Sequence, residues 1–228
     1  MQYISFLLIL FLGLSTAAKP VFDRDYSAIK PGSGVMPESN SNRSRLFPDR
    51  IPGAKIGFST VKASESFQAK TCKDGLKLVM SGDKPTGNAE LRLNLPKCDS
   101  NITFEIKLKL ADFIKGKTVP NTFFIYAAGV NLFFRSDRKD LRCYSMKSKS
   151  YARIAMMKND TWYDIKAVMR FGAKGESFFD LYLNGKELLK NSRMRGKPSK
   201  LSFIRFTMNS KALKQPAPAV IIKSIKIY

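Results

Sequence analysis

The strongest constraint on the fold is an alternation of apolar and polar side chains. Residues 104–110 read Phe-Glu-Ile-Lys-Leu-Lys-Leu, with an apolar side chain at every second position. Successive side chains of an extended chain point to opposite faces, so this pattern predicts a β-strand with one buried face and one solvated face. Strands of this kind are typical of antiparallel sheets.

Similar short apolar segments recur toward the C-terminus, with Gly, Asn and Asp between them. The further predicted strands are residues 122–127, 131–135, 151–156, 162–171, 177–183, 200–208 and 220–228. Room for a helix is left only near residues 186–193. The 228 residues, 44% of them hydrophobic, suffice for the core of one domain. We therefore predict an all-β fold, either an antiparallel two-sheet β-sandwich or a barrel.

Residues 162–188 (WYDIKAVMRFGAKGESFFDLYLNGKEL) carry the most specific motif. Asn184-Gly185 predicts a type I′ turn, because both central residues of that turn need a positive φ. A W-Y-x-I-K-x-V strand, a glycine turn and a D-L-Y-L-N-G-K-E-L strand together resemble the late hairpin of concanavalin A-like, laminin-G-like jelly rolls. The segment 220–228 is similar to the final strand of such domains, which lies beside their first one.

This resemblance implies a jelly-roll sandwich over residues 54–228. The superfamily includes lectins, carbohydrate-binding modules, glucanases, polysaccharide lyases and adhesion domains, so the fold alone does not select a function. For Trp162 and Tyr182, packing within the core or the hairpin is the simpler interpretation, and stacking against a sugar ring is the alternative.

The N-terminus has the layout of a secretory signal peptide. An apolar run from Ile4 to Leu14 precedes small residues, which predicts cleavage after a signal peptide of residues 1–18. The run is shorter than the ~20 apolar residues that span a bilayer. Residues 19–53 are rich in Pro, Gly and Ser, which predicts an irregular arm, a strap over the domain or a propeptide. We expect a secreted, extracellular protein without a transmembrane segment.

Sequons and cysteines fit an exported chain. N-glycosylation sequons begin at Asn42, Asn101 and Asn159. An oxidising compartment would pair two of the three cysteines. Cys72 and Cys98 flank a segment that looks like two strands around a glycine-rich turn, so we predict a disulfide that closes this hairpin. Cys143 is then a buried free thiol or forms an intermolecular disulfide.

Most catalytic chemistry is excluded by residues that the chain lacks. It has no histidine, which removes Ser-His-Asp hydrolysis, Cys-His proteolysis and most histidine-ligated zinc sites. No E-x-D-x-E motif offers the paired carboxylates of a glycosidase strand. The acidic residues on predicted strands are expected to be surface ion partners of Lys and Arg, and they are Glu90, Glu105, Asp164 and Asp180.

The enzyme hypothesis that survives is a polysaccharide lyase with Tyr144 or Tyr151 as the base. The cations that would neutralise the substrate carboxylate are Arg135, Arg142 and Arg153. The lyase motifs of the superfamily are not matched, so we predict a protein that is not an enzyme. We predict no catalytic residue, no metal and no cofactor.

Charge is the strongest indication of function. Lys and Arg number 40 and Asp and Glu 18, a formal net charge of +22. Such an excess attracts polyanions in a salt-dependent manner. The basic side chains gather in two clusters, to which the strand 104–110 adds two lysines. The predicted anion-binding residues are Lys107, Lys109, Arg135, Arg138, Lys139, Arg142, Lys147, Lys149, Arg153, Arg193, Arg195, Lys197 and Lys200.

The favoured function is a secreted, lectin-like binding protein for an anionic glycan, sulfated or rich in uronic acid, or for another extracellular polyanion. The alternatives are a lyase or glycoside hydrolase of the same fold and a structural or adhesive matrix protein whose charge serves bulk cohesion. Phe203, Arg205 and Phe206 could stack bases, but without a recognisable motif we expect only non-specific nucleic-acid binding. The oligomeric state stays open.

Overall fold

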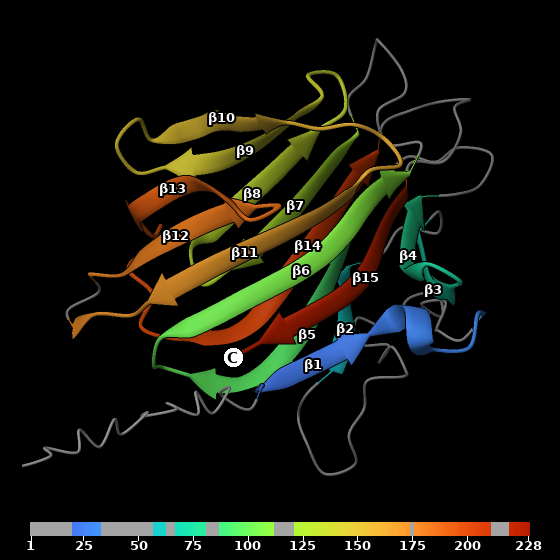
Figure 1. The fold of residues 1–228 in the computed structure, drawn as a ribbon, viewed down its shortest axis with the longest axis horizontal. Coiled ribbons are helices and arrows are strands. Elements are labelled where there is room, and N and C mark those ends of the chain that lie inside the picture. The colour runs from blue at the N-terminus through green and yellow to red at the C-terminus, as the bar shows by residue number, and fades with distance from the viewer. Residues whose placement is uncertain are drawn as a thin grey trace, which may run out of the picture.

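A computed structural model describes residues 20–32, 57–62, 67–80, 87–111, 121–173, 176–210 and 219–228. In this part of the chain two antiparallel sheets pack face to face, and sheet A crosses in front of sheet B in Figure 1. The described elements are strands and one short 3₁₀ helix, η1 (Tyr26–Ala28). The all-β sandwich predicted from the alternation is confirmed. None of the described helices is long and apolar enough for a membrane span.

Sheet A contains the predicted hairpin and the C-terminal strand. Its order is β13 (Lys186–Arg193), β12 (Phe178–Leu183), β11 (Trp162–Arg170), β6 (Ile102–Ala111), β15 (Ala219–Ile227), β4 (Gly75–Met80) and β3 (Phe67–Cys72). The first strand, β1 (Phe22–Asp25), also pairs with β15, beyond the part of β15 that pairs with β4. The last strand thus lies beside β1, which falls in the segment predicted to be an irregular arm, and not beside β2 (Gly57–Lys62), the first strand of the predicted domain.

Sheet B is built from the middle of the chain and from three strands that join it from elsewhere in the sequence. Its order is β10 (Ser150–Met156), β9 (Asp140–Ser145), β8 (Val130–Arg135), β7 (Thr122–Ala127), β14 (Leu201–Ser210), β5 (Gly87–Cys98) and β2 (Gly57–Lys62). The four strands β7 to β10 form a meander of consecutive antiparallel pairs.

The core lies between the two sheets, and the alternation decides which side chains reach it. In β6, Phe104, Ile106 and Leu108 are at most 2% exposed. From sheet B, Phe123 and Phe206 stack in the core with their ring centroids 6.2 Å apart. Because inward and outward side chains alternate along each strand, the two outward faces point to opposite sides of the molecule.

The Asn-Gly hairpin has the predicted turn. Leu183 of β12 pairs with Lys186 of β13, and the two residues between them, Asn184 and Gly185, have φ of 50° and 78°. The helix considered possible near residues 186–193 does not form, because this segment continues the hairpin as strand β13. That part of the prediction was wrong, since the turn chemistry commits the following residues to pairing with β12.

Part of the segment predicted to be an irregular arm belongs to the sandwich. Phe22 pairs with Ile227, and Tyr26 is 0% exposed. Here β-pairing and burial replace the irregular structure expected from Pro and Gly. The segments predicted to be a signal peptide and the rest of the arm, and the sequon residue Asn42, lie outside the described residues.

The hairpin between Cys72 and Cys98 is not formed, and both thiols are free. Cys72 ends β3 and pairs with Gly75 at the start of β4, whereas Cys98 ends β5 in the other sheet. The predicted disulfide is therefore absent, because β4 and β5 belong to different sheets and do not pair with each other. Cys143 is also free, and burial raises the pKa of its thiol to about 12.

Candidate functional site

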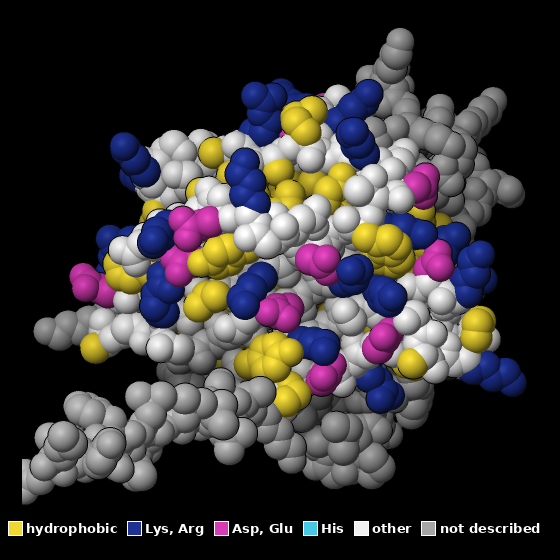
Figure 2. Space-filling view, viewed as in Figure 1, with side chains coloured by type: hydrophobic (Ala, Val, Ile, Leu, Met, Phe, Trp, Pro, Cys, Tyr) yellow, Lys and Arg dark blue, Asp and Glu magenta, His cyan; other side chains and the backbone are white. Residues whose placement is uncertain are grey.

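Several basic side chains on the outward face of sheet A lie in ion pairs with carboxylates. Lys107 Nζ lies 3.2 Å from an Asp164 oxygen, although the two residues are 57 positions apart in the sequence. Lys109 lies 2.8 Å from Asp74 and over the ring of Trp162. Further ion pairs on this face are Lys166–Glu105, Arg170–Asp180 and Lys226–Asp23. Figure 2 shows this face, with basic and acidic side chains interspersed.

A hollow of about 680 Å³ on this face is lined by both signs of charge, including Lys107, Lys166, Glu105 and Asp164. Lys107 and Lys109 thus offer little free charge, and they point away from the basic residues of sheet B. The structure does not unite the predicted clusters in one groove.

The ion pair of Arg170 with Asp180 yields a testable prediction about stability. Both guanidinium ends donate to the carboxylate, and the Asn191 N–H donates to it at 2.6 Å. Hydrogen bonding from Arg170 lowers the pKa of Asp180 from 3.8 to about 2. A carboxylate whose pKa is lower in the folded state stabilises the fold above the unfolded pKa and loses that effect as the pH falls through the folded pKa.

Asp180→Asn should therefore lower the free energy of unfolding at pH 7 by about 1–2 kcal/mol, a figure discounted because the arginine is partly solvated. It should also flatten the loss of stability between pH 4 and pH 2, the window set by the two pKa values. Urea unfolding at each pH measures both effects. Asp164→Asn, in a pair whose Asp side chain is 60% exposed, is the control and should change stability by less than ~0.5 kcal/mol. Equal effects from both variants would contradict the assignment.

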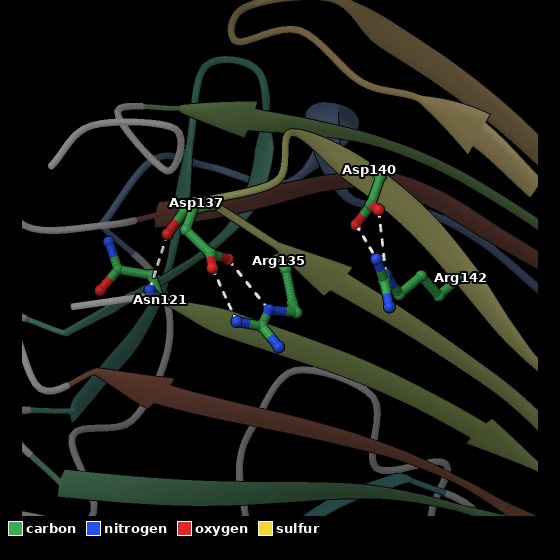
Figure 3. Close-up of polar contacts among 6 residues, drawn as sticks. Asn121, Arg135, Asp137, Asp140 and Arg142 are labelled. Carbon is green, nitrogen blue, oxygen red and sulfur yellow. Dashed lines mark hydrogen bonds and ion pairs between the residues drawn. The ribbon is translucent and has the colours of Figure 1, made fainter. Parts of the chain in front are cut away.

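The first predicted basic cluster is partly neutralised around the turn from β8 to β9. Arg135 donates to both oxygens of Asp137 at 2.9 and 2.6 Å, and this contact lowers the pKa of Asp137. The Arg142 Nε donates to Asp140, which is 2% exposed (Figure 3). The Asn121 N–H donates to the hydroxyl of Ser136 in the same turn. These contacts give Arg135 and Arg142 a structural role in holding the turn.

The other predicted residues are spread over turns and strand ends. Arg138 and Lys139 lie in the β8–β9 turn, Lys147 and Lys149 in the β9–β10 turn, Arg153 on β10, Arg193 at the end of β13, and Lys197 and Lys200 before β14. All of these side chains are exposed. Arg153 lies directly opposite Arg142, so this pair adds positive charge to the outward face of sheet B.

The outward face of sheet B carries a group of aromatic rings at its centre. Phe124 of β7 and Phe133 of β8 stack with centroids 4.2 Å apart and planes within 7°. Tyr151 of β10 meets Phe133 edge-on at 5.3 Å and Tyr144 of β9 at 5.4 Å. On the other side, Tyr126 of β7 stacks against Phe203 of β14 at 5.9 Å.

Three arginines lie over these rings. The guanidinium of Arg92 is 3.8 Å from the centroid of Phe203, that of Arg195 is 4.4 Å from Tyr144, and that of Arg205 is 5.0 Å from Tyr126. Cations over ring faces are attracted by the ring quadrupole. We call this surface the arginine–aromatic face. Its members are Arg92, Arg195, Arg205, Phe124, Tyr126, Phe133, Tyr144, Tyr151 and Phe203, with Glu90 and Asn131 among them.

A hollow of about 640 Å³ lies on this face, lined by residues of the central strands and by Arg195. Glu90 contributes a carboxylate, 3.6 Å from Arg205. Asn131 points outward from β8 but is only 6% exposed, and its Oδ1 has no hydrogen-bond partner within the described ranges. The hollow thus combines flat apolar rings, guanidinium groups and an amide with unused hydrogen-bonding capacity.

Arg195 reaches this face from the far end of sheet A on an anchored loop. The Met194 N–H donates to the Ser177 carbonyl at 2.8 Å, and the Ser177 hydroxyl donates to the Pro198 carbonyl at 2.6 Å. The Arg195 N–H donates to the carbonyl of Gly129, in the turn between β7 and β8. A Cβ on Gly129 would lie 2.3 Å from the Arg195 carbonyl oxygen, so only glycine permits this approach.

The two tyrosines of the lyase hypothesis, Tyr144 and Tyr151, lie on this face with their ring centroids 5.4 Å apart. Burial raises the pKa of Tyr151, and the positive charge of Arg195 opposes that shift only in part. A raised pKa keeps the phenol protonated at neutral pH, whereas a general base must be deprotonated. The described residues contain no cluster of three or more His, Cys, Asp or Glu that could hold a metal ion.

Sequence reasoning found some of this face. Arg195, Arg142 and Arg153 were among the predicted residues, and Phe203 and Arg205 were noted as a basic segment with aromatics. All four acidic residues predicted to be ion partners do pair with Lys or Arg. Arg92, Tyr126 and Asn131 were missed. These residues occupy outward positions in strands with an apolar–polar alternation, and this pattern could have marked them as surface residues. The sequence does not show which strands lie next to one another, so it could not group them into one site.

The comparisons with known proteins identify the fold. No family model matches the chain, and no curated protein sequence matches it. Among solved structures, a sialidase is similar with a TM-score of 0.57 and 13% identity, over 82% of this chain and 18% of the sialidase. The binding domain of botulinum neurotoxin DC, in complex with rat synaptotagmin II, has a TM-score of 0.50 and 13% identity, over 87% of this chain and 48% of that one.

The carbohydrate recognition domain of Emp47p has a TM-score of 0.49 and 12% identity, over 73% of this chain and 90% of that domain. The likenesses to the sialidase and to the neurotoxin domain show a shared fold, in agreement with the jelly roll that the late hairpin implied. The chain spans less than a fifth of the sialidase and about half of the neurotoxin domain. At these identities the likeness extends to the fold and not to the activity.

Proposed function

We propose that this protein is a secreted, lectin-like binding protein for an anionic glycan, and that the arginine–aromatic face of sheet B is its site. The observation that carries the proposal is the placement of three guanidinium groups over aromatic rings on one face, where two of them, Arg195 and Arg205, line a hollow. The predicted polyanion ligand rested on net charge and on two basic clusters along the sequence, and this face supplies a local arrangement for it.

The chemistry of the face suits a charged sugar chain. Aromatic rings provide flat apolar surfaces for the faces of pyranose rings, and guanidinium groups bind carboxylate or sulfate through paired N–H donors. Arg195 is exposed, and the Arg205 side chain is 41% exposed, so both reach a ligand. On sheet A, Lys107 and Lys109 lie closer to carboxylates, at 3.2 and 2.8 Å, than Arg205 lies to Glu90, at 3.6 Å.

Export of the chain belongs to the same proposal. The signal peptide pattern supports it, and two of the sequons lie where an attached glycan could be carried. Asn101 is exposed in the connection between β5 and β6, and Asn159 is half-buried in the connection between β10 and β11. Neither residue is on the arginine–aromatic face, so glycans at these positions leave the proposed site open.

The proposal is tested by binding of the mature protein to heparin at stepped salt concentrations. Arg205→Gln and Tyr126→Ala should each weaken binding about tenfold or more, because one removes a charged hydrogen-bond donor and the other its supporting ring. Binding by the unchanged protein should survive ~0.3 M salt, where dispersed surface charge is mostly screened. Circular dichroism confirms that each variant is folded.

Lys186→Gln is the matched control, since it removes the same charge from an exposed position on sheet A. It should change affinity less than about twofold. If all three variants weaken binding equally, the charge acts in bulk and the structural or adhesive alternative holds. Release of unsaturated product from a uronic-acid polymer, followed by its ultraviolet absorbance, would instead establish the lyase alternative.

A further inference from the structure

We infer, on the premise of the proposed function, that the ligand is a linear glycan with an anionic group on every second sugar residue. The inference comes from the spacing of the two cations that line the hollow, Arg195 and Arg205. A second basis is the side chains near these cations, Asn131 between them and Glu90 beside Arg205.

The two guanidinium groups are held over rings on strands that have one strand between them. Arg205 lies over Tyr126 on β7, and Arg195 lies over Tyr144 on β9. Tyr126 pairs with Asn131 on β8, and the β8–β9 register, continued by one residue from the Leu132–Cys143 pair, places Asn131 next to Tyr144. Tyr126, Asn131 and Tyr144 therefore form one row across the strands.

Neighbouring strands are about 4.8 Å apart, so the two rings of this row lie about 10 Å apart. That distance is close to the length of one disaccharide in an extended pyranose chain. A chain that runs along the row can thus place an anionic group at each guanidinium, with one sugar residue between them.

The position between the guanidinium groups suits a neutral sugar. It is occupied by Asn131, which is 6% exposed and whose Oδ1 has no partner in the described ranges. A hydroxyl both donates and accepts, so it can satisfy the amide in either orientation, whereas a carboxylate only accepts. A carboxylate there would also lose water without gaining a cation, because Arg195 and Arg205 bind the anionic groups of the two flanking sugar residues.

A carboxylate also lines the hollow beside Arg205. Glu90 of β5 lies 3.6 Å from Arg205, and it is the acidic side chain among the described residues that line the hollow. Arg92 pairs with Arg205 across β5 and β14, but its guanidinium lies over Phe203 and it is not among the residues that line the hollow. A chain with a carboxylate on every residue would bring one of them toward Glu90, whereas an alternating chain places a hydroxyl-bearing residue there.

The test compares oligosaccharides of equal length by direct binding titration at one salt concentration. The probes are a hyaluronan oligosaccharide with a uronate on every second residue, an oligogalacturonate with a carboxylate on every residue, and a neutral cello-oligosaccharide. The hyaluronan probe should bind about tenfold more tightly than the oligogalacturonate, although it carries half the charge. The neutral probe should bind more weakly than either.

Variants separate the spacing from other differences between the sugars. Arg195→Gln and Arg205→Gln should each weaken hyaluronan binding about tenfold, and Lys186→Gln should leave it within about twofold. Glu90→Gln, at a surface position, should raise the affinity for oligogalacturonate more than that for hyaluronan.

The possible failures are distinguishable. If oligogalacturonate binds as tightly as hyaluronan or more tightly, and still depends on both arginines, the alternating ligand is overturned while the proposed function stands. Preference for a single-stranded polynucleotide, with a phosphate on every residue, would also overturn it. If no anionic oligosaccharide binds in an arginine-dependent manner, the proposed function falls with it.

Discussion

Tyr26→Ala should lower the free energy of unfolding by about 3–5 kcal/mol, the range for truncation of a large buried side chain. Tyr26 is 0% exposed and lies in η1, directly after the strand β1 that pairs with β15. Its burial shows that the segment around residues 22–29 completes the sandwich. Urea unfolding of the mature chain, with the wild type alongside, measures the effect.

Val21→Ala is the control from the same segment, since Val21 is 37% exposed and should change stability by less than about 0.5 kcal/mol. A loss below ~1 kcal/mol for Tyr26→Ala would contradict the role of this segment. The domain would then begin near residue 54, the boundary that the sequence predicts.

Gly129→Ala should cost more than about 2 kcal/mol of stability and should also weaken ligand binding about as much as Arg195→Gln. Gly129 has a φ of +89°, which costs a non-glycine residue about 1–2 kcal/mol, and its Cβ would meet the Arg195 carbonyl oxygen at 2.3 Å. Since that oxygen belongs to the anchored loop, the loop must move and carry the Arg195 guanidinium away from Tyr144. Thermal unfolding and the heparin titration measure the two effects.

Gly196→Ala separates the cost of a positive φ from the cost of a steric clash between the added Cβ and its neighbours. Gly196 has a φ of +79° in the same loop, but nothing lies within 4 Å of an added Cβ. This control should lose only about 1–2 kcal/mol and keep its affinity within about twofold. Equal behaviour of the two variants would contradict the proposed contact between the β7–β8 turn and the loop that carries Arg195.

Local patterns in the sequence determined the strands and their faces. The alternation of residues 104–110 predicted a half-buried strand, and Phe104 and Leu108 are indeed buried in it. Asn184-Gly185 predicted the turn because positive φ is a property of those residues themselves. Both signals concern neighbours along the chain, so no tertiary information was needed to interpret them.

Errors arose where the order of strands across a sheet mattered. Cys72 and Cys98 were expected to close one hairpin, but β4 and β5 separate into different sheets. The anion-binding role of Lys107 stays a prediction, and its ion-pair partner Asp164, 57 residues away, could not be assigned to it from the sequence. An apolar–polar alternation with a period of two residues predicts which side chains point outward, but it does not predict which strand lies beside another.

The sequence by itself determined the all-β class, the late hairpin and the excess of positive charge. Only the tertiary structure decided that Arg205 of β14 meets Tyr126 of β7 and Glu90 of β5, and that a loop after β13 brings Arg195 to Tyr144. The physical reason is that alternation is a local steric property, whereas strand order depends on how the whole apolar surface of two sheets is buried together.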